Sequence, residues 1–146
     1  MSKPDTLPFE TTIMVRDNCL CLHVQRAARA LARRYDAALK PFGLNNGQFS
    51  LLMSLNRPEP PRMGAVAELL SMDRTTLTAA LKPLERRGLV ASVADGTDRR
   101  SRRLRLTEAG REVLAQALPA WKKTQATTGK MLADKDQLRA ELLALS

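Results

Sequence analysis

The chain has 146 residues and a formal net charge of +9, and 44% of its residues are hydrophobic although only 3% are aromatic. This length fits one domain with an aliphatic core, which favours packed helices. No apolar run approaches the ~18 residues that a spanning helix needs, and the polar first ten residues lack the apolar segment of a secretion signal. We therefore expect a cytoplasmic protein with reduced cysteines and a polyanionic partner, without membrane binding.

The N-terminal third is expected to hold an arm followed by two helices. Residues 1–16 form a polar arm that contains prolines, and residues 17–56 form the helices. The first helix, over residues 17–40, carries an apolar stripe at three- and four-residue steps: Cys21, Val24, Ala28, Leu31 and Tyr35. Its other face is basic, with Arg26, Arg29, Arg33 and Arg34. Asn45 and Gln48 predict a capping box at the start of the short second helix.

The next segment has the spacing of a helix-turn-helix. If Ala67 is the small residue where two helices cross, every position that the motif buries is apolar: Val66, Leu70, Met72, Leu77 and Ala80. The turn covers residues 71–73, and Asp73 is a suitable N-cap for a helix over residues 74–87. Gly88 suits the position just after that helix.

The second helix of this motif begins with residues that donate hydrogen bonds to phosphates or base edges: Arg74, Thr75, Thr76 and Thr78. We expect Thr76 and Thr78 to lie at base edges. Arg74 and Lys82 are expected nearer to phosphates.

A basic β-hairpin follows. Residues 89–93 are typical of a strand, Asp95–Gly96 is a turn signal, and residues 103–106 alternate between charged and apolar. The loop between the strands includes Arg99, Arg100 and Arg102. Nine basic and four acidic residues lie between positions 73 and 105, so this segment carries +5 of the chain's +9. Such a concentration of charge is typical of a nucleic-acid-binding surface.

Two further helices are expected after the hairpin, within residues 107–146. One begins at Thr107–Glu108 and ends near residue 131, and the other covers residues 136–145. Because the terminal helices are amphipathic on more than one face, a small core cannot cover them. A second copy of the chain is the simplest partner, so the protein is expected to be a homodimer.

From about residue 17 to its C-terminus, the chain resembles the MarR family of winged-helix transcription regulators. The match rests on LxxLExRGLV, beginning at Leu81, and on DxxDRRxxxLxLTxxG, beginning at Asp95. The resemblance implies a single domain over residues 1–146, mainly α with a small β-wing. In it, residues 62–106 form the winged helix-turn-helix region, and the N- and C-terminal helices form the dimer.

The resemblance also implies roles for individual residues. The helix over residues 74–87 would enter the major groove, and Arg100 would reach the minor groove from the wing tip. Asp98 would brace the wing by pairing with a nearby arginine. The family also suggests a small-molecule effector, whose binding residues the sequence does not identify.

Cys21 has two interpretations. Its place on the apolar stripe predicts a small buried hydrophobic residue with little reactivity. Alternatively, Cys21 with Arg29 and Tyr35 is similar to the organic-peroxide-sensing branch of the family, in which the matching cysteine is oxidised and tyrosines stabilise its thiolate. Two of the three tyrosine positions of that branch hold Gln25 and Asn46 here.

No catalytic constellation, cofactor motif or metal-ligand spacing is present in the sequence, so we expect neither an enzyme nor a bound cofactor or metal. The favoured function is a dimeric regulator that binds double-stranded DNA at a pseudo-palindromic operator and is released by a ligand or an oxidant. The alternative is a winged-helix module that docks a protein. The basic wing and the hydroxyl-rich helix favour DNA.

Overall fold

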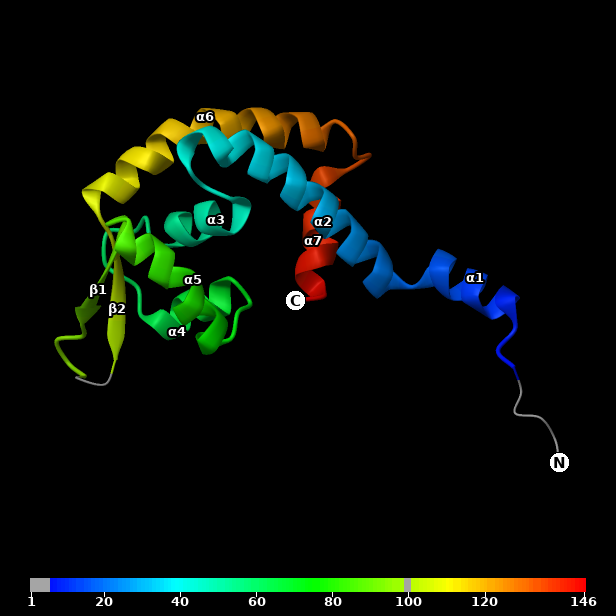
Figure 1. The fold of residues 1–146 in the computed structure, drawn as a ribbon, viewed down its shortest axis with the longest axis horizontal. Helices are drawn as coiled ribbons and strands as arrows, with labels where there is room; N and C mark the ends of the chain where they lie inside the picture. Colours follow the sequence, from blue (N-terminus) through cyan, green and yellow to red (C-terminus); the bar gives the residue numbers. More distant parts are fainter. Residues whose placement is uncertain (1–5, 99–100) are drawn as a thin grey trace. The chain divides into compact units, whose positions relative to one another are not determined.

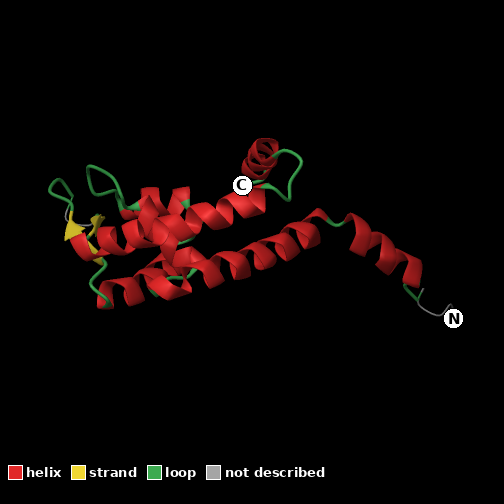
Figure 2. Cartoon of the chain, turned by 90° about the horizontal axis from the view of Figure 1, so that it is seen from above, coloured by secondary structure: helices red, strands yellow, loops and turns green. Residues whose placement is uncertain are grey.

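The computed structural model describes residues 6–98 and 101–146, and it divides the chain into two compact units, residues 1–34 and 35–146. Helices dominate, and a two-stranded antiparallel sheet is the small β element (Figures 1 and 2). The expected fold class is thereby confirmed. Within the described part of the chain, no helix is both long and apolar enough to cross a membrane.

The first unit differs from the sequence expectation. Instead of an arm over residues 1–16, helix α1 covers Phe9–Asn18, and α2 begins only afterwards, covering Leu20–Leu39. Cys19 separates them with an extended backbone (φ −69°, ψ 110°). The proline that suggested an arm, Pro8, is the N-cap of α1, where its fixed φ suits a helix start. Glu10 in the first turn and Arg16 in the last complement the helix dipole.

The stripe on α2 is left mostly uncovered in the single chain, as expected of a terminal helix that a small core cannot cover, and the expected burial of Cys21 is wrong for the single chain. Cys21, Val24, Ala28 and Leu31 are all exposed, and Val24 and Leu31 keep 41% and 38% of their surface accessible. The periodicity correctly marks one apolar face of the helix. It does not tell whether that face is covered by the same chain.

The second unit begins with the end of α2 and a short 3₁₀ helix, η1 (Lys40–Phe42). It continues with helices α3 (Asn46–Ser54), α4 (Met63–Leu69) and α5 (Arg74–Arg86). Strands β1 (Val90–Ala94) and β2 (Arg102–Leu106) form the hairpin, and helices α6 (Glu108–Gly129) and α7 (Lys135–Ala144) complete the chain.

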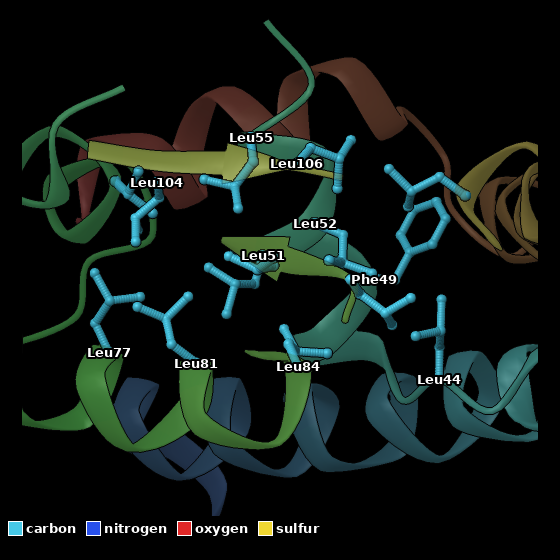
Figure 3. Packing of buried hydrophobic residues seen from close by; sticks show 14 of the residues in the cluster. Leu44, Phe49, Leu51, Leu52, Leu55, Leu77, Leu81, Leu84, Leu104 and Leu106 are labelled. Atoms are coloured by element: carbon cyan, nitrogen blue, oxygen red, sulfur yellow. The ribbon is translucent and has the colours of Figure 1, made fainter. Parts of the chain in front are cut away.

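Leucines form the core of this unit. Leu77, Leu81 and Leu84 on α5 point toward side chains of α3 and β2 (Figure 3). The facing residues are Leu51, Leu52, Leu104 and Leu106, each at most 1% exposed. The Phe49 ring of α3 stacks on Trp121 of α6 with centroids 6.0 Å apart. These contacts hold helix, strand and helix together by burial of aliphatic surface.

Local capping signals correctly predict most element boundaries. The capping box at α3 is present, since the Asn45 carbonyl side chain accepts from the Gln48 amide nitrogen at 2.8 Å and the Gln48 side chain accepts from the Asn45 amide at 3.1 Å. Gly88 ends α5 in the left-handed region with φ 71°. The Thr107 hydroxyl donates to the Gly88 carbonyl oxygen at 2.6 Å and also caps α6.

Gly110, in the first turn of α6, lies against the backbone of the neighbouring segment. A Cβ there would overlap the Leu89 carbonyl oxygen and lie 2.6 Å from Leu106 Cδ1. Because backbone cannot move aside cheaply, overpacking outweighs the gain in helix propensity. We expect Gly110→Ala to lower the free energy of unfolding by about 1–2 kcal/mol, measured by urea denaturation.

Gly96→Ala is the matched control, because a Cβ at Gly96 would meet no atom within 4 Å. Its stability should stay within about 0.5 kcal/mol of the wild type. Equal stability of Gly110→Ala and wild type would contradict the close packing of α6 on Leu89.

Candidate nucleic-acid interface

The helix-turn-helix is formed by α4, a tight turn and α5. At the end of α4, Ser71 adopts a left-handed backbone with φ 53°. The Met72 amide donates to the Ala67 carbonyl at 2.8 Å, and the Ser71 amide donates to the Glu68 carbonyl at 3.1 Å. This pair of bonds is a Schellman motif, which reverses the chain after α4. Glycine would adopt this left-handed conformation without strain, and this chain has a serine at the position instead.

Asp73 then starts α5 as expected. Its Oδ1 accepts from the Thr76 amide nitrogen at 2.7 Å, and its Oδ2 accepts from the Thr76 hydroxyl at 3.0 Å. These two bonds hold the pKa of the Asp73 carboxyl below its usual value. The carboxylate is therefore charged at neutral pH beside the positive end of the helix dipole.

The leucine face of α5 is buried, which leaves the opposite face for a partner. The structure exposes five of the predicted contact residues along one helix: Arg74, Thr75, Thr76, Thr78 and Lys82. The Thr78 hydroxyl donates to the Arg74 carbonyl oxygen at 2.8 Å. These five exposed residues are called the recognition surface: Thr75 and Lys82 lie opposite the buried leucines, and the other three lie to either side of them.

The wing is a hairpin with a third segment at its edge. Val90 lies opposite Leu106 and Ala94 lies opposite Arg102, in antiparallel register. Beyond β2, the Leu104 amide donates to the Pro61 carbonyl at 2.9 Å. The chain before α4 therefore pairs with the wing, and the wing and the helix-turn-helix form one structure.

A buried carboxylate directly after β1, where the wing loop begins, strengthens this connection. Asp95 is 6% exposed, and its oxygens lie 3.0 Å from Arg62 Nη2 and 3.6 Å from Arg103 Nε. It also accepts from the Thr97 amide and hydroxyl at 3.2 and 3.0 Å. The Thr97 amide and hydroxyl and the two guanidinium charges hold the pKa of Asp95 below its usual value, although burial acts in the opposite direction.

The sequence identifies Asp95 as a turn residue and as the first residue of the family motif, and the resemblance assigns the bracing of the wing to Asp98 instead. The bracing by Asp98 stays a prediction. The sequence signal for Asp95 is an acidic residue directly after a strand in a hairpin rich in arginine. Its partner Arg62 lies more than thirty residues away, however, and no local pattern identifies such a pair.

The basic residues of the wing have different environments. Arg102 is exposed and lies 3.4 Å from the Ser92 hydroxyl. Arg103 is half-buried, donating to the Pro60 carbonyl at 2.8 Å as well as pairing with Asp95. Arg99 and Arg100 lie outside the described residues, so their predicted contacts stay predictions.

Cys19 lies just before α2 and Cys21 lies in its first turn, and Cys21 is not buried as expected. Cys21 is exposed, and the Gln25 side-chain amide donates to its sulfur at 3.2 Å. Cys19 is half-buried, and its sulfur accepts from the Leu22 amide at 3.4 Å. Among the described residues, no group of three or more His, Cys, Asp or Glu side chains is placed to hold a metal ion.

The fold and this surface define a winged helix-turn-helix protein. The model of the MarR family matches residues 44–101. The chain is 35% identical to the transcriptional activatory protein BadR of Rhodopseudomonas palustris over 123 residues, which cover 80% of this chain and 67% of BadR. It is 31% identical to the transcriptional repressor MprA of Escherichia coli, over 81% of this chain and 65% of MprA.

Among solved structures, the transcriptional regulator MosR of M. tuberculosis in complex with DNA is similar over 88% of this chain and 93% of that chain, with 38% identity and a TM-score of 0.82. The chain therefore belongs to the MarR family and is a transcription regulator, as the sequence motifs indicate.

Asp95→Asn removes the charge between Arg62 and Arg103 while it keeps the side-chain shape. Since the pKa of Asp95 is lowered in the folded protein, its carboxylate stabilises the fold above the ordinary value of 3.8 and loses this effect as the pH falls through the lower folded pKa. We expect a lower thermal midpoint for Asp95→Asn near neutral pH, and a difference from wild type that narrows below pH 3.8.

The control is Asp136→Asn, which removes an exposed ion pair with Arg139 on α7. Exposed ion pairs contribute little to the free energy of unfolding, so the thermal midpoint of Asp136→Asn should differ only slightly from that of the wild type. A constant difference between Asp95→Asn and wild type at every pH would contradict the role of the Asp95 charge.

Proposed function

We propose that the protein is a homodimeric repressor that binds a pseudo-palindromic operator in double-stranded DNA. The recognition surface carries the proposal, because it presents hydroxyl and basic side chains from a helix whose other face is fixed in a leucine core. The likeness to MosR solved in complex with DNA supports it. A chromosomal target also implies that the protein acts in the cytoplasm.

In this proposal α5 enters the major groove. Thr76 and Thr78 lie at base edges, with Thr75 beside them, and Arg74 and Lys82 neutralise phosphates. The wing contributes Arg99, Arg100 and Arg102, of which Arg100 enters the minor groove. Because phosphate contacts release counterions, log K should fall with log salt by about 0.9 per contact.

A second copy of the chain is proposed as the partner of the terminal helices. These helices expose large apolar side chains within residues 6–39 and 131–145: Leu20, Val24 and Leu31, and Met131, Leu142, Leu143 and Leu145. A dimer would bury them and bring two recognition helices to half-sites about 10 base pairs apart.

Arg100→Ala should weaken operator binding by about 1–3 kcal/mol if the arginine makes a specific groove contact. Fluorescence anisotropy with an operator found by footprinting measures the affinity. The matched control is Lys130→Ala, which removes one positive charge at the C-terminal cap of α6. Equal losses in the two variants would show that only overall charge matters at the wing tip.

Leu143→Glu should weaken the dimer, since Leu143 is 75% exposed in the single chain and lies on α7. Light scattering at micromolar concentration should return a dimer for wild type and a lower mean mass for this variant. Leu69→Glu is the control, because Leu69 is also exposed but lies on α4. A wild-type monomer would contradict the proposed assembly.

Repression with release by a small molecule is the favoured mode of control. Release by an oxidant is the alternative, and the exposure of Cys21 is the observation that favours it. Treatment of the reduced protein with cumene hydroperoxide, with Cys21→Ser in parallel, separates the two. If the wild type loses operator binding after this treatment and Cys21→Ser keeps it, the release is assigned to oxidation of Cys21.

A protein-docking winged helix is the second candidate function. The charge of the wing argues against it, because nucleic acid is the partner that such a surface attracts most strongly. Footprinting on genomic DNA tests the choice. An absence of any protected site would favour the docking module.

A further inference from the structure

Two threonine hydroxyls on the recognition surface already use their hydrogen within the protein. The Thr76 hydroxyl lies 3.0 Å from Asp73 Oδ2, and the Thr78 hydroxyl lies 2.8 Å from the Arg74 carbonyl oxygen. A backbone carbonyl has no hydrogen to donate, and an ionised carboxylate has none either. In both pairs, therefore, the threonine is the donor.

A hydroxyl has one hydrogen and two lone pairs. Once its hydrogen points inward, it offers only lone pairs to a partner. Thr75, between Arg74 and Thr76, differs: in the described part of the chain no side-chain hydrogen bond holds its hydroxyl, which is exposed and free to rotate. The three threonines therefore present two acceptors and one group that can donate or accept.

We propose that Thr76 and Thr78 act in the major groove as hydrogen-bond acceptors only, and so select bases that present an amine there: adenine through N6 or cytosine through N4. The inference rests on the proposed function, in which α5 enters the major groove. Guanine and thymine present O6 and O4 acceptors at the corresponding place. Two facing acceptors repel each other, so these bases are disfavoured where the hydroxyls lie.

The selection is sharper at Thr76 than at Thr78. Thr76 donates to a charged acceptor, and such bonds are stronger than those to a neutral carbonyl. Asp73 is itself held in place, because its other oxygen accepts from the Thr76 amide at 2.7 Å. To donate to DNA, Thr76 would have to abandon this carboxylate, whereas Thr78 would abandon only the Arg74 carbonyl.

Selection from a DNA library randomised in one half-site tests the inference with wild type, Thr76→Val and Thr78→Val. Valine keeps the shape of threonine and removes the hydroxyl. Wild type should enrich adenine or cytosine at one position per hydroxyl, and each valine variant should lose about 3- to 10-fold of that preference at its own position. Thr127→Val is the control, because the exposed Thr127 hydroxyl on α6 makes the same kind of bond, donating to the Lys123 carbonyl oxygen at 2.9 Å, and lies outside α5. It should not change the preference at either position.

Two chemical changes test the direction of the hydrogen bond. Purine in place of the selected adenine, or 2-pyrimidinone in place of the cytosine, removes only the amine and should weaken wild type but not the corresponding valine variant. Asp73→Ser keeps an oxygen for the Thr76 amide and releases the Thr76 hydroxyl, so guanine or thymine should become acceptable at that position. Thermal unfolding of every variant checks that it folds.

The outcomes separate this inference from the proposed function. A wild-type protein that enriches no sequence contradicts the proposed function, and the inference fails with it. A wild-type protein that enriches an operator, but with guanine or thymine at the Thr76- and Thr78-dependent positions, overturns only the inference. Valine variants that keep every wild-type preference overturn it as well.

Discussion

The packing of one face of α5 on the leucine core is the contact on which the recognition surface depends. Leu77 and Leu84 are completely buried, and Leu81 nearly so. Since side chains on a helix follow a period of 3.6 residues, fixing these three leucines fixes the directions of all the others. Thr75, Thr78 and Lys82 face solvent for this reason. The position of the surface is thus a consequence of apolar burial, whereas its chemistry is a separate matter of hydrogen bonds and charge.

Local sequence was sufficient for features whose partners lie within a few residues. The Asn45–Gln48 capping box, the Asp73 cap and the stop at Gly88 are each formed within one helical turn, and each was predicted. Asp95 was missed as a brace because its partner Arg62 is brought near by the pairing of the chain before α4 with β2. Periodicity likewise found the apolar face of α2 but wrongly predicted that Cys21 on that face is buried.

The arginines of the wing illustrate why counting charges describes a binding surface only coarsely. Arg103 contributes to the excess of positive charge, yet it pairs with Asp95 and donates to the Pro60 carbonyl. Its side chain therefore supports the hairpin from within, and Arg102 is exposed. Net charge predicted the class of partner correctly because the long-range field sums over all these residues. Which arginine contacts the partner depends on the hydrogen bonds that each already makes.

The same distinction applies to the threonines, where the choice is between donor and acceptor. A threonine in a sequence can do both, and sequence reasoning treated the hydroxyls of α5 as donors. The fold removes that freedom, because the N-cap carboxylate of Asp73 and the helix carbonyl of Arg74 take the two hydrogens. Asp73, which caps the start of α5, thereby also determines that the Thr76 hydroxyl offers an acceptor to a base. Capping and base selection are coupled through Asp73, so a change at this cap alters both the stability of α5 and the pattern of acceptors that it presents.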